Sequence, residues 1–214
     1  MTLAYLESNC VKQISKSYFL DDLILDRHGR ARLWRLKTYG AFLYPKIKVS
    51  SCKKSITITQ RFIENKIDVL DVDTLKLFDD LPQMIAGLQN IELVHGDLKL
   101  SNLAYDNNQL SIFDWEPTLL SFDRIGKLQV RTSKYSVHPD DFLDRKISFK
   151  SDLKGMVLVL LQNTLGRAKG AKTAGKFAEK IDRLTSKEQD PFLVAEKIKD
   201  LCNLNQCRQS EDIF

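Results

Sequence analysis

Apolar and polar residues alternate in the first third of the chain, which predicts short β-strands. The alternation covers residues 10–14 and 56–62, and residues 47–49 look like a further short strand, joined to 56–62 by a polar turn at 50–54. A period of two places successive side chains on opposite faces of a strand. Residues 30–43 instead carry leucines at helical spacing. We expect a small part of mixed strand and helix that ends near residues 63–73.

Helical periodicity dominates the rest of the chain. Apolar residues recur every three or four positions over residues 74–91, with Pro82 inside, where we expect a kink or a shifted start. Ser151 is expected to cap a buried helix at 152–165. Two more helices are expected at 171–184 and 191–201.

A compact segment of strands and turns is predicted between these helices, from residue 93 to residue 114. Asp106, Asn107 and Asn108 favour a hairpin turn between strands at 103–105 and 110–113. A long irregular stretch, 116–149, follows it. Loops of that length in compact domains are usually functional.

Composition narrows the class of protein. The chain has 214 residues, 43% hydrophobic and 29% charged, which suits one folded domain and excludes a wholly disordered chain. Its longest apolar stretch, residues 156–161, is far too short to span a bilayer. The first residues do not have the pattern of a signal peptide. We therefore expect a cytoplasmic protein, with delivery into another cell by a route that leaves no signal peptide as an alternative.

Cysteine and charge counts add two constraints. The four cysteines are scattered without a CxxC motif, which favours a reduced chain over a zinc site or a disulfide framework. The net charge is +5, from 33 basic and 28 acidic residues. This mild excess favours an anionic ligand but falls short of a nucleic-acid footprint, so no specific nucleic-acid partner is expected.

The candidate chemistry lies between His95 and Asp114. Phosphoryl transfer needs a carboxylate to orient the attacking hydroxyl, oxygen ligands for Mg²⁺ and a cation near the transferred group. Asp97 supplies the carboxylate, Asn102 and Asp114 supply the ligands, and Lys99 supplies the cation. The hairpin between Asn102 and Asp114 would return the chain so that both ligands face one point.

This segment resembles the catalytic loop and metal-binding motif of the protein-kinase-like superfamily, H-R-D-L-x-x-x-N followed by D-F-G. The resemblance implies ATP and Mg²⁺ as cofactors. It implies that Asp97 and Lys99 are catalytic and that Asn102 and Asp114 bind the metal. Lys99, Asn102 and Asp114 would also bind the nucleotide, together with Lys12 on an early strand. His95 would have a structural role.

The resemblance extends over roughly residues 10–165. Residues 132–140 are similar to the end of a kinase activation loop, and Asp152 is similar to the residue that braces the catalytic loop. The implied fold is α+β, a two-lobed protein-kinase-like fold in a single domain, 1–214. A reduced β-rich N-lobe would span 1–63 and a mostly helical C-lobe 64–202, followed by a loose tail at 203–214.

The chain also departs from the family pattern. Gly96 replaces the arginine that would contact a phosphorylated activation loop, so control by loop phosphorylation is not expected. Glu116 replaces the glycine of D-F-G, as in small-molecule phosphotransferases of the superfamily. A glycine-rich loop is missing, and Lys12 has no evident glutamate partner. The Arg-rich residues 30–36 are similar to a helix of bacterial lipopolysaccharide-core sugar kinases.

Three functions follow from these features. The first is a minimal Ser/Thr protein kinase that acts on a protein substrate, which the Lys99 pattern favours. The second is a sugar or small-molecule kinase of the same superfamily. The third is a pseudokinase that serves as a binding module.

A basic segment at residues 170–176 nearly spells a phosphate-binding P-loop. Phe177 stands where a Ser or Thr should meet Mg²⁺, and a helix rather than a strand precedes the segment. We expect a solvated basic loop there. It is a candidate site for an acidic protein partner.

Overall fold

The computed structural model describes residues 2–6, 9–15, 23–24, 31–32, 34–35, 47–51, 55–61, 68–106, 108–115, 121–122, 137–144 and 148–207. Within them, side chains are described mainly from residue 68 onward. None of the helices in this part of the chain is long and apolar enough to cross a membrane.

A four-stranded antiparallel sheet is built from the first 61 residues. Its strands are β1 (Thr2–Leu6), β2 (Asn9–Ser15), β4 (Ile47–Ser51) and β5 (Ser55–Arg61), in the order β1-β2-β5-β4. Strands β2, β4 and β5 confirm the three strands expected from the sequence, whereas β1 was not expected. Residues 31–32 and 34–35 are helical, within the helix predicted at 30–43, and the rest of that helix lies outside the described residues.

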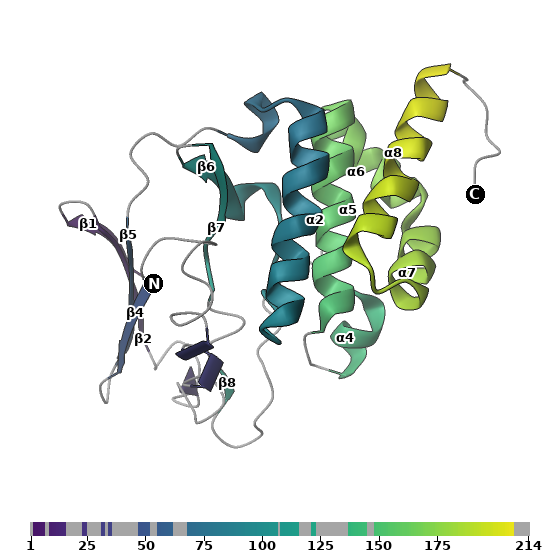
Figure 1. The fold of residues 1–214 in the computed structure, drawn as a ribbon. Helices are drawn as coiled ribbons and strands as arrows, with labels where there is room; N and C mark the ends of the chain where they lie inside the picture. The colour runs from purple at the N-terminus through teal and green to yellow at the C-terminus, as the bar shows by residue number, and fades with distance from the viewer. Residues whose placement is uncertain are drawn as a thin grey trace.

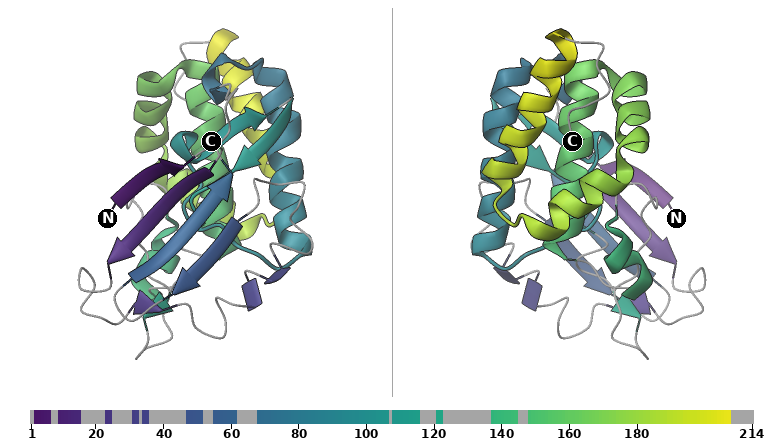
Figure 2. Two further views of the ribbon diagram at one scale, coloured as in Figure 1. Left: turned by 90° about the vertical axis from the view of Figure 1, so that its left-hand side faces the viewer. Right: turned by 90° about the vertical axis from the view of Figure 1, so that its right-hand side faces the viewer.

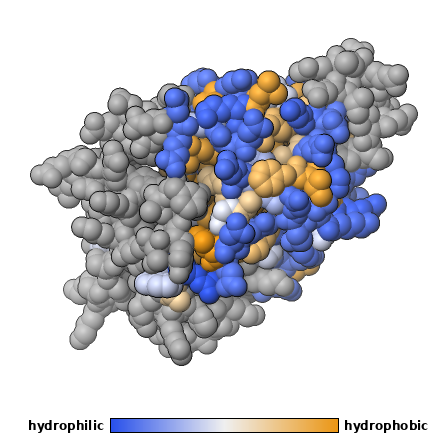
Figure 3. All heavy atoms as spheres, in the orientation of Figure 1, coloured by the Kyte–Doolittle hydropathy of each residue, from blue (hydrophilic) through white to orange (hydrophobic). Residues whose placement is uncertain are grey.

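Five helices pack together at the other end of the molecule (Figure 1), and the described surface on the face shown in Figure 3 is mostly hydrophilic with some hydrophobic residues among the hydrophilic ones. The five helices are α2 (Thr74–Asn90), α5 (Phe149–Leu165), α6 (Arg167–Lys176), α7 (Ala178–Lys187) and α8 (Pro191–Cys207). Helix α5 is the central one and contacts each of the others. As its sequence predicted, α5 is buried on most faces, with continuous burial from Ser151 to Val157.

A hairpin of β6 (Leu103–Asp106) and β7 (Gln109–Ile112) lies between the helices and the four-stranded sheet (Figures 1 and 2). Its register pairs Leu103 with Ile112 and Asp106 with Gln109, which confirms the predicted hairpin but places Asp106 in the first strand instead of the turn. Asn108 in that turn has φ +65°, a left-handed conformation that asparagine tolerates better than most residues.

The hairpin is tied to α2 by a polar contact. The Tyr105 hydroxyl donates a 2.7 Å hydrogen bond to Asp80 on α2, and Lys76 pairs with the same carboxylate at 2.7 Å. Tyr105 itself is buried. The first strand of the hairpin therefore has a fixed position relative to the helices.

The stretch expected to be irregular, 116–149, contains two short elements. Strand β8 (Ser121–Phe122) pairs with β3 (Leu23–Ile24), and a short helix, α4, spans Pro139–Asp144. Most of the other residues of this stretch lie outside the described ranges.

Several helix boundaries differ from prediction. Ser148, not Ser151, caps α5, and its hydroxyl accepts a hydrogen bond from the Lys150 N–H. The Ser151 hydroxyl is used elsewhere, since it donates to Asp141 on α4. Pro82 does not shift the start of α2, because the Asp73 side chain caps the helix by accepting from the Leu75 N–H.

The last three helices also depart from the predicted pattern. The helix expected at 171–184 is two helices, α6 and α7, which meet at Phe177. The basic segment 170–176 belongs to α6, so it is helical rather than a loop. Helix α8 continues to Cys207, so residues 203–207 are helical and not part of a loose tail.

Candidate active site

The loop between α2 and β6 is held by a carboxylate of α5. Asp152 is fully buried, and its two oxygens accept hydrogen bonds of 2.8 Å from the backbone N–H groups of His95 and Gly96. Gly96 has φ +80°, where glycine is favoured. Burial raises the pKa of Asp152 to about 7, against the two N–H donors, which favour the charged form. The bracing contact expected of Asp152 is confirmed.

Helix α5 approaches this loop closely at a glycine. A Cβ atom added to Gly155 would lie 2.6 Å from the Leu98 carbonyl oxygen and 2.8 Å from its Cβ. Both distances are shorter than any ordinary contact, so only glycine allows this packing. The sequence analysis did not single out Gly155, because its importance depends on a contact with a residue 57 positions away.

His95 connects the loop to the end of the hairpin. Its Nδ1 accepts a 3.2 Å hydrogen bond from the Asp97 N–H, and its Nε2 lies 3.0 Å from the Phe113 carbonyl oxygen. Nε2 therefore carries the proton and the ring is neutral. Burial lowers the pKa of His95 to about 4. The ring packs edge-on against buried Trp115, with centroids 4.8 Å apart. The structural role predicted for His95 is consistent with these contacts.

Asp97 is a buried carboxylate with one oxygen held and one oxygen open. Its Oδ2 accepts from the Lys99 ammonium at 2.6 Å and from the Asn102 amide at 3.3 Å. Its Oδ1 is buried and has no hydrogen-bond partner among the described residues. Burial raises the pKa of Asp97, and the bond and charge of Lys99 lower it in part. An unpaired buried carboxylate oxygen is costly, which points to a ligand that donates to it.

Asn102 is oriented by the same loop. Its Nδ2 donates to the Asp97 carbonyl oxygen at 2.9 Å, which turns Oδ1 to the other side of the amide. The Ser101 hydroxyl lies 3.4 Å from that Oδ1. The Asn102 side chain is buried, so its orientation is fixed before any ligand binds. An amide oxygen presented in this way is a suitable ligand for a hard cation.

The hairpin brings Asp114 back toward Asn102. The Phe113 N–H donates a 3.0 Å hydrogen bond to the Asn102 carbonyl oxygen, and Asp114 is the residue that follows Phe113. Its φ is +71°, an uncommon value for a residue other than glycine. The negative charge of Asp114 raises the pKa values of both Asp97 and His95, which places its carboxylate near them. The predicted return of the chain is therefore present.

These oxygen donors fit a magnesium site completed by a nucleotide. Mg²⁺ is commonly held by one or two protein oxygens together with substrate phosphates and water. Asn102 and Asp114 supply two such groups, and open Oδ1 of Asp97 lies in the same loop. Among the described residues no three His, Cys, Asp or Glu side chains form a metal cluster, so the protein alone does not supply a full ligand set there.

Two of the residues named in the sequence analysis cannot be placed in the site. Lys12 lies on β2, where its backbone pairs with Leu3 and Ile58, and its side chain is outside the described residues. Glu116 is also outside them. The structure thus brings together Asp97, Lys99 and Asn102, with Asp114 close by, and leaves the role of Lys12 a prediction.

The segment similar to the end of an activation loop is fixed to the helices. Asp141 on α4 is fully buried, and its Oδ2 accepts from the Ser148 N–H at 2.8 Å and from the Ser148 hydroxyl at 2.9 Å. The Ser151 hydroxyl, which donates to the same oxygen, also accepts from the His138 N–H at 3.0 Å. The end of this segment therefore has a defined position next to the start of α5.

Comparison with known proteins supports the fold. Neither the protein-family models nor the curated protein sequences contain a match. Among solved structures, the chain is similar to the Cydia pomonella granulovirus kinase PK-1, with 13% sequence identity and a TM-score of 0.50. The match covers 72% of this chain, which spans only 60% of the length of that kinase chain. At this identity the likeness shows the fold alone, so the fold is kinase-like and α+β, as predicted.

Proposed function

We infer that this chain is an ATP- and Mg²⁺-dependent phosphotransferase, a minimal Ser/Thr protein kinase that transfers the γ-phosphoryl group to a protein hydroxyl. The observation that carries this proposal is the state of Asp97. One carboxylate oxygen is fixed by Lys99 and Asn102, and the other is buried without a partner among the described residues. That oxygen is suited to accept a hydrogen bond from the hydroxyl that attacks the phosphorus.

The neighbouring residues have complementary tasks in this proposal. The Lys99 ammonium, 2.6 Å from Asp97 and half-exposed, offsets the charge that develops on the transferred phosphoryl group. Asn102 Oδ1 and the Asp114 carboxylate hold Mg²⁺, which supplies charge neutralisation at the nucleotide phosphates when bound. Lys12, whose backbone lies on β2, is the residue proposed to bind the phosphates. The four-stranded sheet and the helices then correspond to the two lobes of a kinase, with the hairpin between them.

The raised pKa of Asp97 is compatible with this role. A base accepts a proton more readily when its pKa lies closer to the working pH, and burial moves the pKa of Asp97 in that direction. The hydrogen bond and the charge of Lys99 oppose this shift. Burial also excludes water that would compete for the open oxygen.

The test is phosphate transfer from γ-labelled ATP with Mg²⁺, using protein acceptors and a cell lysate. Asp97→Ala and Asp114→Ala should abolish transfer, whereas Glu196→Ala, which removes an exposed carboxylate of α8, should not. Thermal stabilisation by ATP with Mg²⁺ should survive in Asp97→Ala and disappear in Asp114→Ala, because of these two residues only Asp114 is proposed to bind the metal.

Each outcome has a defined meaning. A protein kinase is supported if the parent and Glu196→Ala label protein whereas Asp97→Ala and Asp114→Ala do not. Label on a sugar or another small acceptor would replace the protein substrate while keeping the phosphotransferase. Transfer by Asp97→Ala at the parental rate would refute the role of the base, and neither transfer nor nucleotide binding by the parent would favour a pseudokinase.

A further inference from the structure

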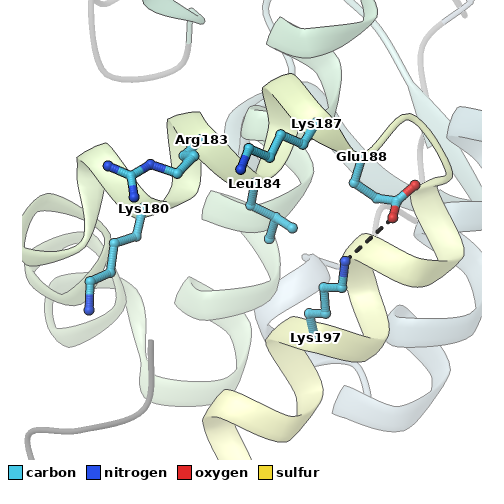
Figure 4. A pocket seen from close by; sticks show the side chains of 6 residues that line it. All are labelled: Lys180, Arg183, Leu184, Lys187, Glu188 and Lys197. Atoms are coloured by element: carbon cyan, nitrogen blue, oxygen red, sulfur yellow. Dashed lines mark hydrogen bonds and ion pairs between the residues drawn. The ribbon is translucent and has the colours of Figure 1, made fainter.

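A pocket of about 330 Å³ opens on the surface between α7 and α8 (Figure 4). It is lined by Lys180, Arg183, Leu184, Lys187, Glu188 and Lys197. None of these residues belongs to the active site described above. In Figure 4, Leu184 lies at the centre of the group with the long basic side chains around it. The pocket therefore combines a small apolar floor with a basic rim.

The basic rim follows from the helical repeat of α7. Lys180, Arg183 and Lys187 are three and four positions apart, which places them on one face of the helix. Arg183 and Lys187 are exposed and have no carboxylate partner among the described residues. The one acidic residue of the pocket, Glu188, is already paired with Lys197 at 3.4 Å.

Helix α7 carries two acidic residues, Glu179 and Asp182, and neither lines the pocket. Asp182 forms an ion pair of 2.6 Å with Lys154 on α5, a side chain that is only 8% exposed. The preceding helix, α6, is also basic and contains no acidic residue. Its cations are Arg167, Lys169, Lys172 and Lys176. Four cations and one carboxylate line the pocket, a positive balance that attracts and orients anionic partners.

We propose that this pocket, the α7–α8 pocket, binds an acidic segment of a partner protein through one apolar side chain flanked by carboxylates. The apolar side chain packs on Leu184, and the flanking carboxylates pair with Arg183 and Lys187. Charge complementarity and the single apolar floor both favour this occupant. The six lining residues include no aromatic ring on which a base could stack, and one leucine offers too little apolar surface to enter a bilayer.

The experiment measures binding by fluorescence anisotropy on the full chain without nucleotide. The probe is a fluorescein-labelled peptide with one leucine between two pairs of glutamates. Arg183→Glu combined with Lys187→Glu should weaken binding roughly tenfold or more. The matched control, Arg167→Glu with Lys169→Glu, makes the same change of charge on exposed positions of α6 and should have a much smaller effect. Thermal melts of both variants check that the fold is kept.

The apolar contact is tested with a second peptide. Replacement of the leucine of the probe by serine should weaken binding to the parent and have little effect on the Arg183→Glu, Lys187→Glu variant. Equal losses in the two charge variants, or no effect of the leucine, would overturn the proposal in favour of non-specific attraction. Tighter binding of a single-stranded RNA or of anionic vesicles through the same two residues would also overturn it. These results do not depend on phosphotransfer, so the two proposals fail separately.

Discussion

Gly155 offers the sharpest test of how α5 positions the candidate catalytic loop. Its Cα faces the backbone of Leu98, the residue that follows Asp97. In Gly155→Ala the new Cβ would begin 2.6 Å from the Leu98 carbonyl oxygen, whereas ordinary contacts start near 3.4 Å. The loop or the helix must therefore move by about 0.8 Å. Neither neighbour is the flexible end of a side chain, so the strain falls on the backbone.

The expected loss of stability combines two opposing effects. Forcing an extra methyl group into a tightly packed position costs roughly 1–3 kcal/mol. Alanine is favoured over glycine in a helix by about 1 kcal/mol. Because the clash involves backbone, we take the upper end and expect a net loss of about 2 kcal/mol. A displacement of nearly 1 Å next to Asp97 should also lower the rate of phosphotransfer by up to about a hundredfold.

Two other glycines provide controls. A Cβ at Gly170 of α6 would lie 2.5 Å from the Leu161 carbonyl oxygen of α5, so Gly170→Ala should lose stability. Gly170→Ala should keep the parental kcat, because Leu161 lies on a different turn of α5 from Gly155. A Cβ at Gly175 meets nothing within 4 Å, so Gly175→Ala should gain roughly 0.4–1 kcal/mol.

The measurements are urea denaturation for the free energy of unfolding and phosphotransfer at saturating ATP for kcat. Only Gly155→Ala should lose both. If Gly155→Ala were as stable and as active as Gly175→Ala, the close approach would not be a constraint on the site. An equal loss of kcat in Gly170→Ala would show that α5 as a whole, and not its contact with Leu98, sets the rate.

Three further predictions concern the polar groups of the site. Burial raises the pKa of Asp97 above its unfolded value, so the parent loses stability as the pH rises above about 4, the ordinary aspartate value. Asp97→Asn should abolish phosphotransfer yet gain stability relative to the parent over that rise in pH. A gap that did not widen with pH in urea melts would contradict this. Lys99→Met removes the cation that lowers the pKa of Asp97, so the acidic limb of the pH profile of kcat/KM should move to higher pH. An unchanged limb would mean that a group other than Asp97 determines it. Asp152→Ala leaves the N–H groups of His95 and Gly96 without acceptors and should cost about 2–6 kcal/mol, at about 1–3 kcal/mol for each. Asp152→Asn, which keeps one acceptor, should lose clearly less, and equal losses in urea melts would argue against these two bonds.

Much of the local structure could be predicted because its causes are local. The hairpin of β6 and β7 follows from two short, mostly apolar segments on either side of turn residues, and Asn108 adopts a left-handed conformation that asparagine tolerates. The strands β2 and β5 follow from alternation of apolar and polar residues. The candidate site was recognisable because Asp97, Lys99 and Asn102 lie within six consecutive residues of one loop.

The misplaced boundaries have tertiary causes. Ser148 and Ser151 are both able to cap α5, but the Ser151 hydroxyl accepts from the His138 N–H, a group 13 positions away that the sequence pattern does not reveal. The break between α6 and α7 falls at Phe177, which is neither a proline nor a glycine, and which packs against the core. The sequence also does not reveal Gly155, because its neighbour Leu98 is distant along the chain.

Acid is expected to affect the site through two groups that are protonated separately, the Asp97 carboxylate and the neutral ring of His95. Protonation of Asp97 would stop the reaction at once and reversibly, without changing the fold. Protonation of His95 at Nδ1 would place a second N–H against the Asp97 N–H and break that hydrogen bond, and burial disfavours the charged ring, so protonation is resisted until the pH falls to about 4. Relative to the ordinary histidine value of 6.5, this costs the native state about 3 kcal/mol of stability across that range. A residue that never touches the substrate would thus decide whether acid inactivation is momentary or leads to unfolding.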